Sequence, residues 1–326
     1  MQKSDEVDIL VIGGGPAGST AASMAAKSGL SVKVCERSKF PREHVGESLL
    51  PASIGILEEL GLNEAISNAG FLPKYGATMV WGKDETPWSW RFSETNKQNI
   101  HSYQVSRPIF DEILLKRSAE LGVLVEEESS VSKILTDDSN RGVVVTNKMG
   151  QEYFQPAKFI VDASGQSALL ARNFDLRQWD EHFQNLAIYG YFAGAKKLDA
   201  PNENNIFIES YENGWVWAIP LNDDTTSVGA VVDSNESNAK LRKTDPITFL
   251  KDQLSMTNRT SHMLSEAELK SDVKILKDWS YTTSKMAGDG WVLAGDAACF
   301  IDPLFSSGVH LAMMSGVLAS AYAVTC

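Results

Sequence analysis

The stretch Val7-Asp8-Ile9-Leu10-Val11-Ile12-Gly13-Gly14-Gly15-Pro16-Ala17-Gly18 decides how the rest of the chain folds. Its first six residues are mostly apolar and β-branched, which is typical of a buried parallel strand. Gly13, Gly15 and Gly18 then form G-x-G-x-x-G. The first glycine permits a tight turn, the second lets the backbone approach a pyrophosphate, and the third lets a helix pack close to the strand. The stretch therefore predicts a phosphate-binding turn, followed by a helix whose positive end faces the phosphates.

The following residues complete this unit. The expected helix has a face of small residues: Ala21, Ala22, Ala25 and Ala26. Ser31 to Cys35 resumes as a strand, and Glu36 follows it about 20 residues after the glycines, where an acid accepts hydrogen bonds from ribose hydroxyls. A glycine-rich turn without a ligand is the weaker alternative, because strand, glycines, helix, strand and acid stand in register.

Length and composition narrow the class of protein. The chain has 326 residues, 43% of them hydrophobic, which is enough for one large domain or two intertwined ones. A net charge of −12 without any Lys/Arg run argues against a nucleic-acid-binding surface. Three cysteines without C-x-x-C or metal spacing fit a reducing compartment, and the polar N-terminus shows no signal peptide. We therefore predict a cytoplasmic protein without a metal site.

The apolar run from Val309 to Val324 is short, rich in Ala, Gly and Ser, and contains His310. We expect a buried core helix there and no membrane span. The chain stops at Cys326, just after this run, so we expect either an unusually short protein or a fragment.

Two arginines stand near expected helix starts. Arg42 lies in a loop with two prolines that leads into a helix from about Ala52 to Leu60, and Arg107 opens another helix. Either one is able to meet a phosphate or the edge of a cofactor. For Arg42, composition alone favours a solvated side chain, and a surface position is the alternative for Arg107.

Later strands divide into two kinds. Phe159 to Val161 is a second buried strand, and it ends in Asp162-Ala163-Ser164-Gly165, a carboxylate and tight turn where doubly wound folds place cofactor contacts. Four further segments alternate with a period of two, which is typical of antiparallel strands: Leu186–Ala193, Asn205–Glu209, Gly214–Pro220 and Ser227–Asp233. We predict an α/β fold, with a nucleotide-binding domain at 1–72, 101–172 and 280–326 and an inserted β-sheet domain at 73–100 and 173–279.

The last buried strand begins at Trp291 and runs into Gly295-Asp296. After it comes the loop Asp302-Pro303-Leu304-Phe305-Ser306-Ser307-Gly308, which leads into the final helix. Small residues before a helix point several backbone N–H groups at one spot, so this loop predicts an anion-binding nest.

These separated signatures resemble those of FAD-dependent monooxygenases related to aromatic hydroxylases: Gly13 to Gly18, Asp162 to Gly165 and Gly295-Asp296. Two further features narrow the resemblance to flavin-dependent halogenases. Gly214-Trp215-Val216-Trp217-Ala218-Ile219-Pro220 matches the W-x-W-x-I-P motif, and Lys74 in F-L-P-K-Y-G-A falls at the position of the active-site lysine. The resemblance covers Val7 to Ala323 and implies a Rossmann-like FAD-binding domain of the glutathione-reductase type.

The resemblance also implies a set of site residues. FAD is expected to contact Gly13, Gly15, Pro16, Ala17, Gly18, Glu36, Arg37, Arg42, Ser48, Arg107, Asp162, Gly165, Asp296, Pro303, Ser306, Gly308 and Val309. The amides of Ser307 and Gly308 are expected to hold the halide. Trp215, Trp217 and Phe305 are expected to wall the substrate side, although two core tryptophans are nearly as good an explanation of the pair.

Two departures from the family pattern bear on substrate. Tryptophan halogenases carry a glutamate where this chain has Phe305, and the phenylalanine version resembles halogenases of phenols and pyrroles, free or bound to an acyl carrier protein. A phenol is electron-rich and needs less help in losing its ring proton than an indole carbon does, so it can do without that glutamate. The second departure is that the family's C-terminal region, which covers the substrate, is expected to be absent.

The resemblance implies a reaction in which reduced FAD, delivered by a separate flavin reductase, and O₂ oxidise chloride or bromide to hypohalous acid. Lys74 then hydrogen-bonds the acid or becomes a haloamine, and the halogen reaches an aromatic substrate in secondary metabolism. A desolvated lysine can lose its proton near neutral pH, whereas an arginine cannot. The alternatives are a solvated surface lysine, an aromatic hydroxylase or geranylgeranyl-reductase-like enzyme, and a flavin-binding module without turnover.

Overall fold

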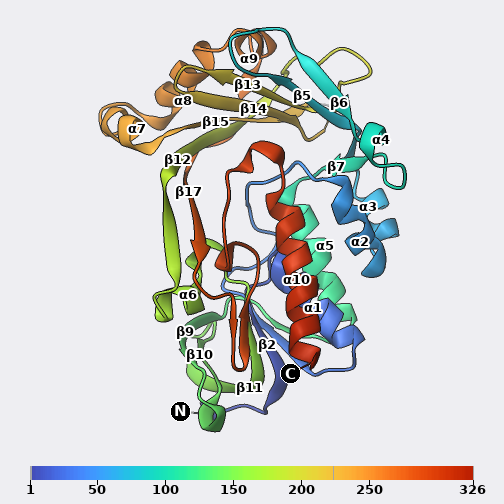
Figure 1. Cartoon of the computed structure of the whole chain (residues 1–326), viewed down its shortest axis with the longest axis vertical. Coiled ribbons are helices and arrows are strands. Elements are labelled where there is room, and N and C mark those ends of the chain that lie inside the picture. The colour runs from blue at the N-terminus through green and yellow to red at the C-terminus, as the bar shows by residue number, and fades with distance from the viewer. Residues whose placement is uncertain (1, 223, 326) are drawn as a thin grey trace.

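Two β-sheets, placed one beyond the other along the long axis in Figure 1, form the framework of the chain. The computed structural model describes residues 2–222 and 224–325. The first sheet has the order β18-β19-β11-β2-β3-β8, and β19, β11, β2, β3 and β8 run parallel. Its strands on this path are β2 (Val7–Ile12), β3 (Val32–Cys35), β8 (Leu124–Glu126), β11 (Glu152–Asp162), β18 (Ala287–Gly288) and β19 (Trp291–Leu293). Three more strands pair around the start of β11, namely β1 (Gln2–Lys3), β9 (Ser130–Leu135) and β10 (Gly142–Thr146).

Three helices cover one face of the first sheet. They are α1 (Pro16–Lys27), α5 (Arg107–Glu120) and α10 (Gly308–Thr325), which run side by side in Figure 1. The small face of α1 lets them approach, since a Cβ on Gly316 of α10 would lie 2.5 Å from the carbonyl of Ala17. On the other face, Leu10 and Ile12 pack against β9, β10 and α6 (Leu169–Asn173). Both faces are covered, as the continuous apolar strands predict.

The second sheet is mostly antiparallel, in the order β16-β12-β15-β14-β13-β5-β6, with β17 also paired to β12. Its strands are β5 (Gly76–Val80), β6 (Trp88–Arg91), β12 (Arg177–Ala193), β13 (Ile206–Tyr211), β14 (Gly214–Pro220), β15 (Thr225–Asp233), β16 (Glu268–Leu269) and β17 (Lys274–Thr283). Helices α7 (Ser234–Leu241), α8 (Pro246–Ser255) and α9 (Arg259–Met263) lie at its outer side in Figure 1. The inner face carries Tyr189, Trp215 and Trp217, and Leu304 from the other body packs against it. The expected fold, a Rossmann-like domain with an inserted antiparallel sheet, is confirmed.

The remaining elements are short. They are η1 (Pro51–Ser53), α2 (Ile54–Glu59), α3 (Asn63–Asn68), β4 (Leu72–Lys74), α4 (Phe92–Thr95), β7 (Ser102–Gln104), η2 (Asp138–Asn140), η3 (Gly165–Ser167), η4 (Gly295–Ala297) and η5 (Pro303–Phe305). β4 and β7 form a separate antiparallel pair. This pair carries the lysine that the sequence singles out.

Three elements differ from the sequence-based expectations. β12 starts at Arg177, not Leu186, because its first half is exposed and lacks a buried face that would give a period of two. Helices α7 to α9 were not predicted. The apolar run expected to be a buried helix forms α10, but only one side of it is buried: Leu311, Met314 and Leu318 are exposed. By length and composition α10 is the one helix among the described residues that could cross a membrane.

Candidate active site

The turn between β2 and α1 is built for a phosphate. Gly13 has a φ of +100°, and a Cβ on Gly18 would lie 1.9 Å from the carbonyl oxygen of Gly13, so neither position accepts a side chain. Gly15 caps α1 without a side-chain hydrogen bond, and Pro16 has no N–H to offer. The remaining N–H groups of the first turn are therefore available to an anion, with Ala17 among the turn residues.

Two carboxylates, those of Glu36 and Asp162, lie at the ends of parallel strands and at the same edge of the first sheet. Glu36 follows β3, and its two carboxylate oxygens accept from the N–H groups of Gly14 and Ser38, both at 2.7 Å. Asp162 ends β11 and accepts from the N–H groups of Ser164 (3.0 Å) and Leu170 (2.6 Å). These bonds fix both carboxylates, while each oxygen retains lone-pair capacity for a ligand hydroxyl.

Two more predicted residues lie beside these carboxylates. Arg37 donates to the Ser167 hydroxyl at 3.2 Å, in the turn that Gly165 opens with a φ of +63°. The D-A-S-G turn and the glycine turn touch, because a Cβ on Gly13 would lie 2.4 Å from the carbonyl of Ala163. Segments 150 residues apart thus form one binding edge.

A buried ion pair holds the loop that crosses this edge. The Arg107 Nε and Nη2 donate to the two oxygens of Asp111 (2.8 and 3.0 Å), and its Nη1 donates to the carbonyls of Val45 (2.5 Å) and Gly46 (3.3 Å). The Arg42 Nη1 forms an ion pair with the same carboxylate at 3.2 Å, without a well-aligned hydrogen bond among the described residues. The Arg42 guanidinium is partly buried beside the glycine turn, since a Cβ on Gly15 would lie 3.2 Å from its Nη2. The expectation of a solvated arginine from composition alone is wrong. Asp111 was not predicted, although its position four residues after Arg107 on a helix was a usable signal.

The last predicted binding segment leads into α10. Burial raises the pKa of Asp296 to about 6, although the nearby Arg107 guanidinium lowers it. η5 ends at Phe305, Ser306 follows it with a φ of +56°, and Gly308 starts the helix. The same segment contains Pro303, Ser307 and Val309. The expected anion-binding nest therefore belongs to the segment that the family resemblance assigns to FAD.

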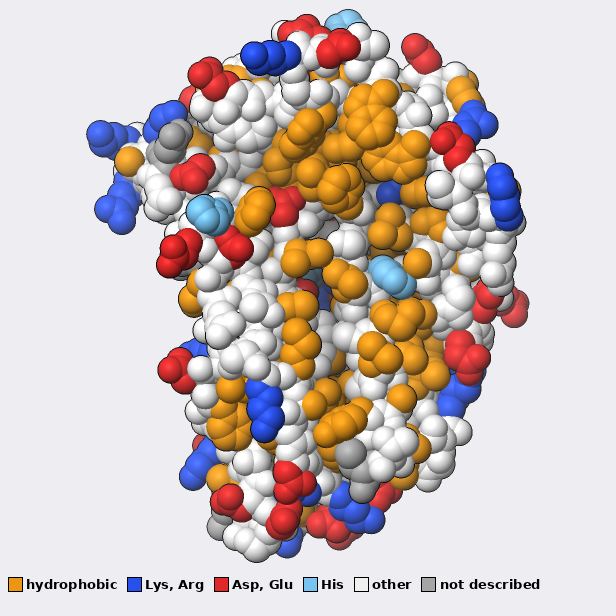
Figure 2. All heavy atoms as spheres, in the orientation of Figure 1, with side chains coloured by type: hydrophobic (Ala, Val, Ile, Leu, Met, Phe, Trp, Pro, Cys, Tyr) orange, Lys and Arg blue, Asp and Glu red, His pale blue; other side chains and the backbone are white. Residues whose placement is uncertain are grey.

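The predicted wall residue Phe305 is exposed. Phe305 is 63% exposed and Ile301 nearby is 50% exposed, so Phe305 does not form a closed wall in this chain. Figure 2 shows hydrophobic side chains gathered along α10 and at the junction with the second sheet. This junction is an open apolar face.

Trp215 and Trp217 project from β14 onto the inner face of the second sheet. Their rings lie 6.0 Å apart between centroids, and Tyr189 lies 6.0 Å from Trp217. The Trp217 Nε1 donates to the Ser227 hydroxyl at 3.3 Å. Both tryptophans are buried, so they form a packed aromatic layer facing the first body.

Lys74 is among the largest fully buried side chains of the described residues, with 1% of its surface exposed. Its Nζ donates to the Ser48 hydroxyl (2.7 Å) and to the Leu49 carbonyl (3.2 Å), and it lies 5.3 Å from the centre of the Phe92 ring. No carboxylate among the described residues forms an ion pair with it. Burial lowers the pKa of Lys74 from 10.5 to about 7. The solvated-lysine alternative is therefore wrong.

A count of donors explains why burial favours the neutral amine. The charged form of Lys74 has three N–H donors, but the described residues offer its nitrogen only two acceptors, the Ser48 hydroxyl and the Leu49 carbonyl. A neutral amine uses both acceptors and leaves its lone pair free. The ring of Phe92 favours the charged form, but at 5.3 Å this attraction is smaller than the cost of burying an unpaired charge.

Glu47 is a buried carboxyl that sequence reasoning missed. It is 1% exposed, its Oε1 accepts from the Tyr191 hydroxyl at 2.9 Å, and its Oε2 has no partner among the described residues. Burial raises its pKa to about 7, although the nearby Ser227 and Tyr191 hydroxyls and the charge of Arg107 lower it. Glu47 lines a cavity of about 320 Å³ between the two bodies, together with Arg107 and Tyr191. An acid in the apolar run G-E-S-L-L was the available signal.

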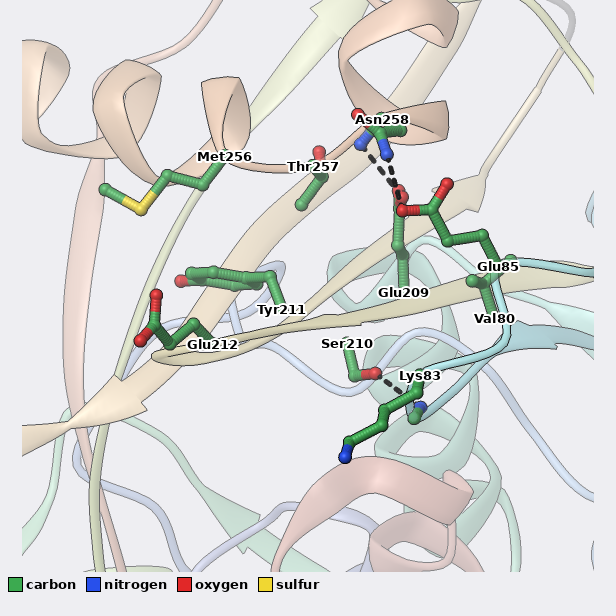
Figure 3. Close-up of a pocket in the computed structure, with 11 residues that line it drawn as sticks. Val80, Lys83, Glu85, Glu209, Ser210, Tyr211, Glu212, Met256, Thr257 and Asn258 are labelled. Atoms are coloured by element: carbon green, nitrogen blue, oxygen red, sulfur yellow. Dashed lines mark hydrogen bonds between the residues drawn. The ribbon is translucent and has the colours of Figure 1, made fainter.

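A larger cavity of about 510 Å³ lies away from these groups, on the far side of the second sheet (Figure 3). Its one buried carboxylate, Glu209, accepts from the N–H groups of Asn258, Arg259 and Thr260 and from the Thr260 hydroxyl. Figure 3 shows Glu209 pointing at the turn before α9. The Glu209 carboxylate therefore fixes that turn.

Comparisons with known proteins agree with this arrangement. The family model of the FAD binding domain matches residues 6–321. The structure of a myxobacterial chondrochloren halogenase, CndH, superposes with a TM-score of 0.93 at 40% identity, over 99% of this chain and 75% of that one. The chain belongs to the flavin-dependent halogenases. Family membership confirms the resemblance deduced from the two tryptophans and Lys74.

Two curated relatives illustrate the range of this halogenase family. A tryptophan 2-halogenase of Chondromyces crocatus is 37% identical over 98% of this chain and 62% of its own length. A 1H-pyrrole-2-carbonyl-(peptidyl-carrier protein) chlorinase of Pseudomonas fluorescens is 35% identical over 97% of this chain and 75% of its own length. The chain thus spans less than two thirds of the first of these relatives.

The residues of this halogenase-family chain fit FAD. Gly13 and Gly18 have no room for side chains, the first turn of α1 offers free N–H groups, and the Arg42 guanidinium lies beside Gly15. No group of three or more possible metal ligands occurs in the described part of the chain. Cys35 and Cys299 are free cysteines.

Proposed function

We propose that this chain halogenates an electron-rich aromatic compound, a phenol or a pyrrole, with chloride or bromide. The observation that carries the proposal is the Lys74 amine, buried without a carboxylate partner and with a pKa of about 7. When bound, reduced FAD together with O₂ would supply the chemistry that oxidises halide to hypohalous acid. A neutral amine accepts halogen from hypohalous acid with loss of water, and the haloamine transfers that halogen to an aromatic carbon in exchange for the ring proton.

The chain's own residues position the cofactor and exclude water. We assign FAD to residues 1–72, 101–172 and 280–326 and the substrate side to 73–100 and 173–279. The turn Gly13 to Gly18 and Arg42 would hold the pyrophosphate, and Glu36 the ribose. The amides of Ser307 and Gly308, in the nest before α10, would hold the halide.

Trp215 and Trp217 would keep the organic substrate away from the cofactor. Their buried rings form a layer on the inner face of the second sheet, whereas hypohalous acid is small enough to travel to Lys74. The aromatic ring would then meet the halogen at the lysine and not the oxygen at the flavin. This separation favours halogenation over hydroxylation.

Phe305 supports a phenol or pyrrole substrate, because it leaves no acid where tryptophan halogenases carry their glutamate. The relative named as a pyrrole carrier-protein chlorinase is consistent with a carrier-bound substrate, and a free phenol is the other option. A separate flavin reductase in the cytoplasm would supply the reduced cofactor.

Product analysis tests the proposal. The chain is incubated with FAD, a flavin reductase with NADH, bromide, O₂ and a panel of phenols and pyrroles. We expect brominated products with the bromine isotope doublet by mass spectrometry. Hydroxylated products, with NADPH oxidation by the chain alone, would show an aromatic hydroxylase; FAD binding without any product would show a flavin-binding module.

A further inference from the structure

We infer that Ser48 is the positioning residue of the Lys74 amine and not a contact of the cofactor. Its hydroxyl accepts from the Lys74 Nζ at 2.7 Å, the shorter of the two bonds that the amine makes. Both groups are buried, Ser48 at 4% and Lys74 at 1% exposure. This inference rests on the proposed role of Lys74 as the halogen carrier.

The backbone explains how a serine in a loop reaches a lysine 26 positions away. β7 pairs with β4 on one side, where Lys74 lies opposite Ser102, and Ser48 forms an isolated bridge with Gln104 on the other side. The Leu49 N–H donates to the Tyr103 carbonyl at 3.0 Å and fixes the segment. Lys74 therefore extends past β7 and meets Ser48 and Leu49 together.

The same segment is tied to the flavin-binding side. Arg107 donates to the carbonyls of Val45 and Gly46, and the Val105 N–H donates to the Glu47 carbonyl at 2.7 Å. Ser48 is thus held on a backbone whose other end is clamped by the buried Arg107–Asp111 pair. Its hydroxyl can direct the amine with little freedom to move, which is what a precise halogen transfer requires.

No other titratable group replaces this contact. The neighbours on the adjoining elements are His101, Tyr103, Arg91, Glu94 and Glu47. His101 lies 3.4 Å from the Tyr103 hydroxyl, Glu94 accepts from the Arg91 N–H, and Glu47 bonds Tyr191. None of these described groups bonds the Lys74 amine, so the acceptors of the amine are Ser48 and Leu49.

A hydroxyl acceptor stabilises the ammonium more than the neutral amine, because hydrogen bonds to charged groups are the stronger ones. Removing it with Ser48→Ala should therefore lower the pKa of Lys74 by roughly half a unit to one unit. Ser48→Thr keeps the hydroxyl and should leave the pKa unchanged. Ser53→Ala is the matched control, since Ser53 is fully buried with a hydroxyl that bonds nothing among the described residues.

The pKa is measured on the full chain carrying ¹³C-labelled lysine at Cε, by NMR titration without halide or aromatic substrate, with Lys74→Arg assigning the signal. The second readout is the pH profile of kcat. In Ser48→Ala the acidic limb of the kcat profile should move to lower pH by the same amount as the Lys74 pKa measured by NMR. We expect kcat to fall roughly tenfold, with the KM for the aromatic compound little changed. A purely structural serine would lower stability without moving that limb.

The outcomes separate the positioning role of Ser48 from the proposed halogenase function. If the Lys74 signal titrates alike in wild type, Ser48→Ala and Ser53→Ala, the positioning role is wrong. If Ser48→Ala does not fold, Ser48→Cys keeps the side-chain size with a weaker acceptor and must shift the pKa in the same direction. If the pKa shifts as expected but wild type makes no halogenated product, the Ser48–Lys74 contact stands and the proposed function fails.

Discussion

Replacing Lys74 with methionine should change how the stability of the fold depends on pH. The folded chain lowers the pKa of Lys74 from 10.5 to about 7, so between these values the unfolded chain binds more protons than the folded one. The contribution of Lys74 to the free energy of unfolding must therefore rise with pH between these two pKa values. A shift of one unit corresponds to about 1.4 kcal/mol, and integration from pH 7 to pH 9 gives a rise of about 2 kcal/mol.

The absolute stability of Lys74→Met at one pH is not diagnostic. Methionine removes the cost of burying an ionisable amine, but it leaves the Ser48 hydroxyl and the Leu49 carbonyl without their donor, at about 1–3 kcal/mol each. These effects oppose each other at pH 7. The slope isolates the amine, because all other titrating groups are shared by both proteins.

Urea unfolding of wild type and Lys74→Met at pH 7, 8 and 9 provides the measurement. The wild-type free energy of unfolding should gain about 2 kcal/mol relative to the variant over this range. Parallel pH dependences would refute the reasoning, since they would mean that Lys74 titrates alike in the folded and unfolded chains.

Three further predictions test other parts of the structure. Gly18→Ala places a methyl group in the glycine turn and should abolish FAD binding measured by flavin fluorescence, whereas Gly55→Ala, in an exposed helix with open space around it, should bind FAD normally. Glu47→Gln removes a group whose folded pKa is raised from 4.5 to about 7, so wild-type stability should fall relative to the variant by roughly 2.5 kcal/mol from pH 4.5 to pH 7, as unfolding curves would show. Asp111→Asn leaves the Arg107 guanidinium buried without its counter-charge and should cost roughly 3–5 kcal/mol in chemical denaturation; a loss below about 1 kcal/mol would show that the pair is not structural.

The sequence could predict the nucleotide-binding half because backbone geometry dictates its residues. Gly13 and Gly18 are required by a positive φ and by a contact that leaves no room for a Cβ. Glu36 and Asp162 end parallel strands, so their meeting at one edge follows from the sheet topology. These constraints are local, and they are readable without knowing the rest of the fold.

The environment of Lys74 could not be predicted in the same way. Its burial depends on three short segments that lie far apart in the sequence, β4, β7 and Ser48-Leu49, and none of them has a period that identifies its partner. Family resemblance assigns Ser48 to the cofactor, and no signal in the sequence indicates the hydrogen bond that its hydroxyl accepts from Lys74. Glu47 was missed for a related reason, since its burial comes from packing against Tyr191 across the two bodies.

Aromatic halogenation by wild type and Lys74→Ala, measured in parallel with a diffusible trap for hypohalous acid, tests the central claim most directly. The account predicts that Lys74→Ala still binds FAD and still releases oxidised halogen to the trap, while halogenated aromatic product falls by roughly a hundredfold or more. Wild-type amounts of halogenated aromatic product from Lys74→Ala would contradict it.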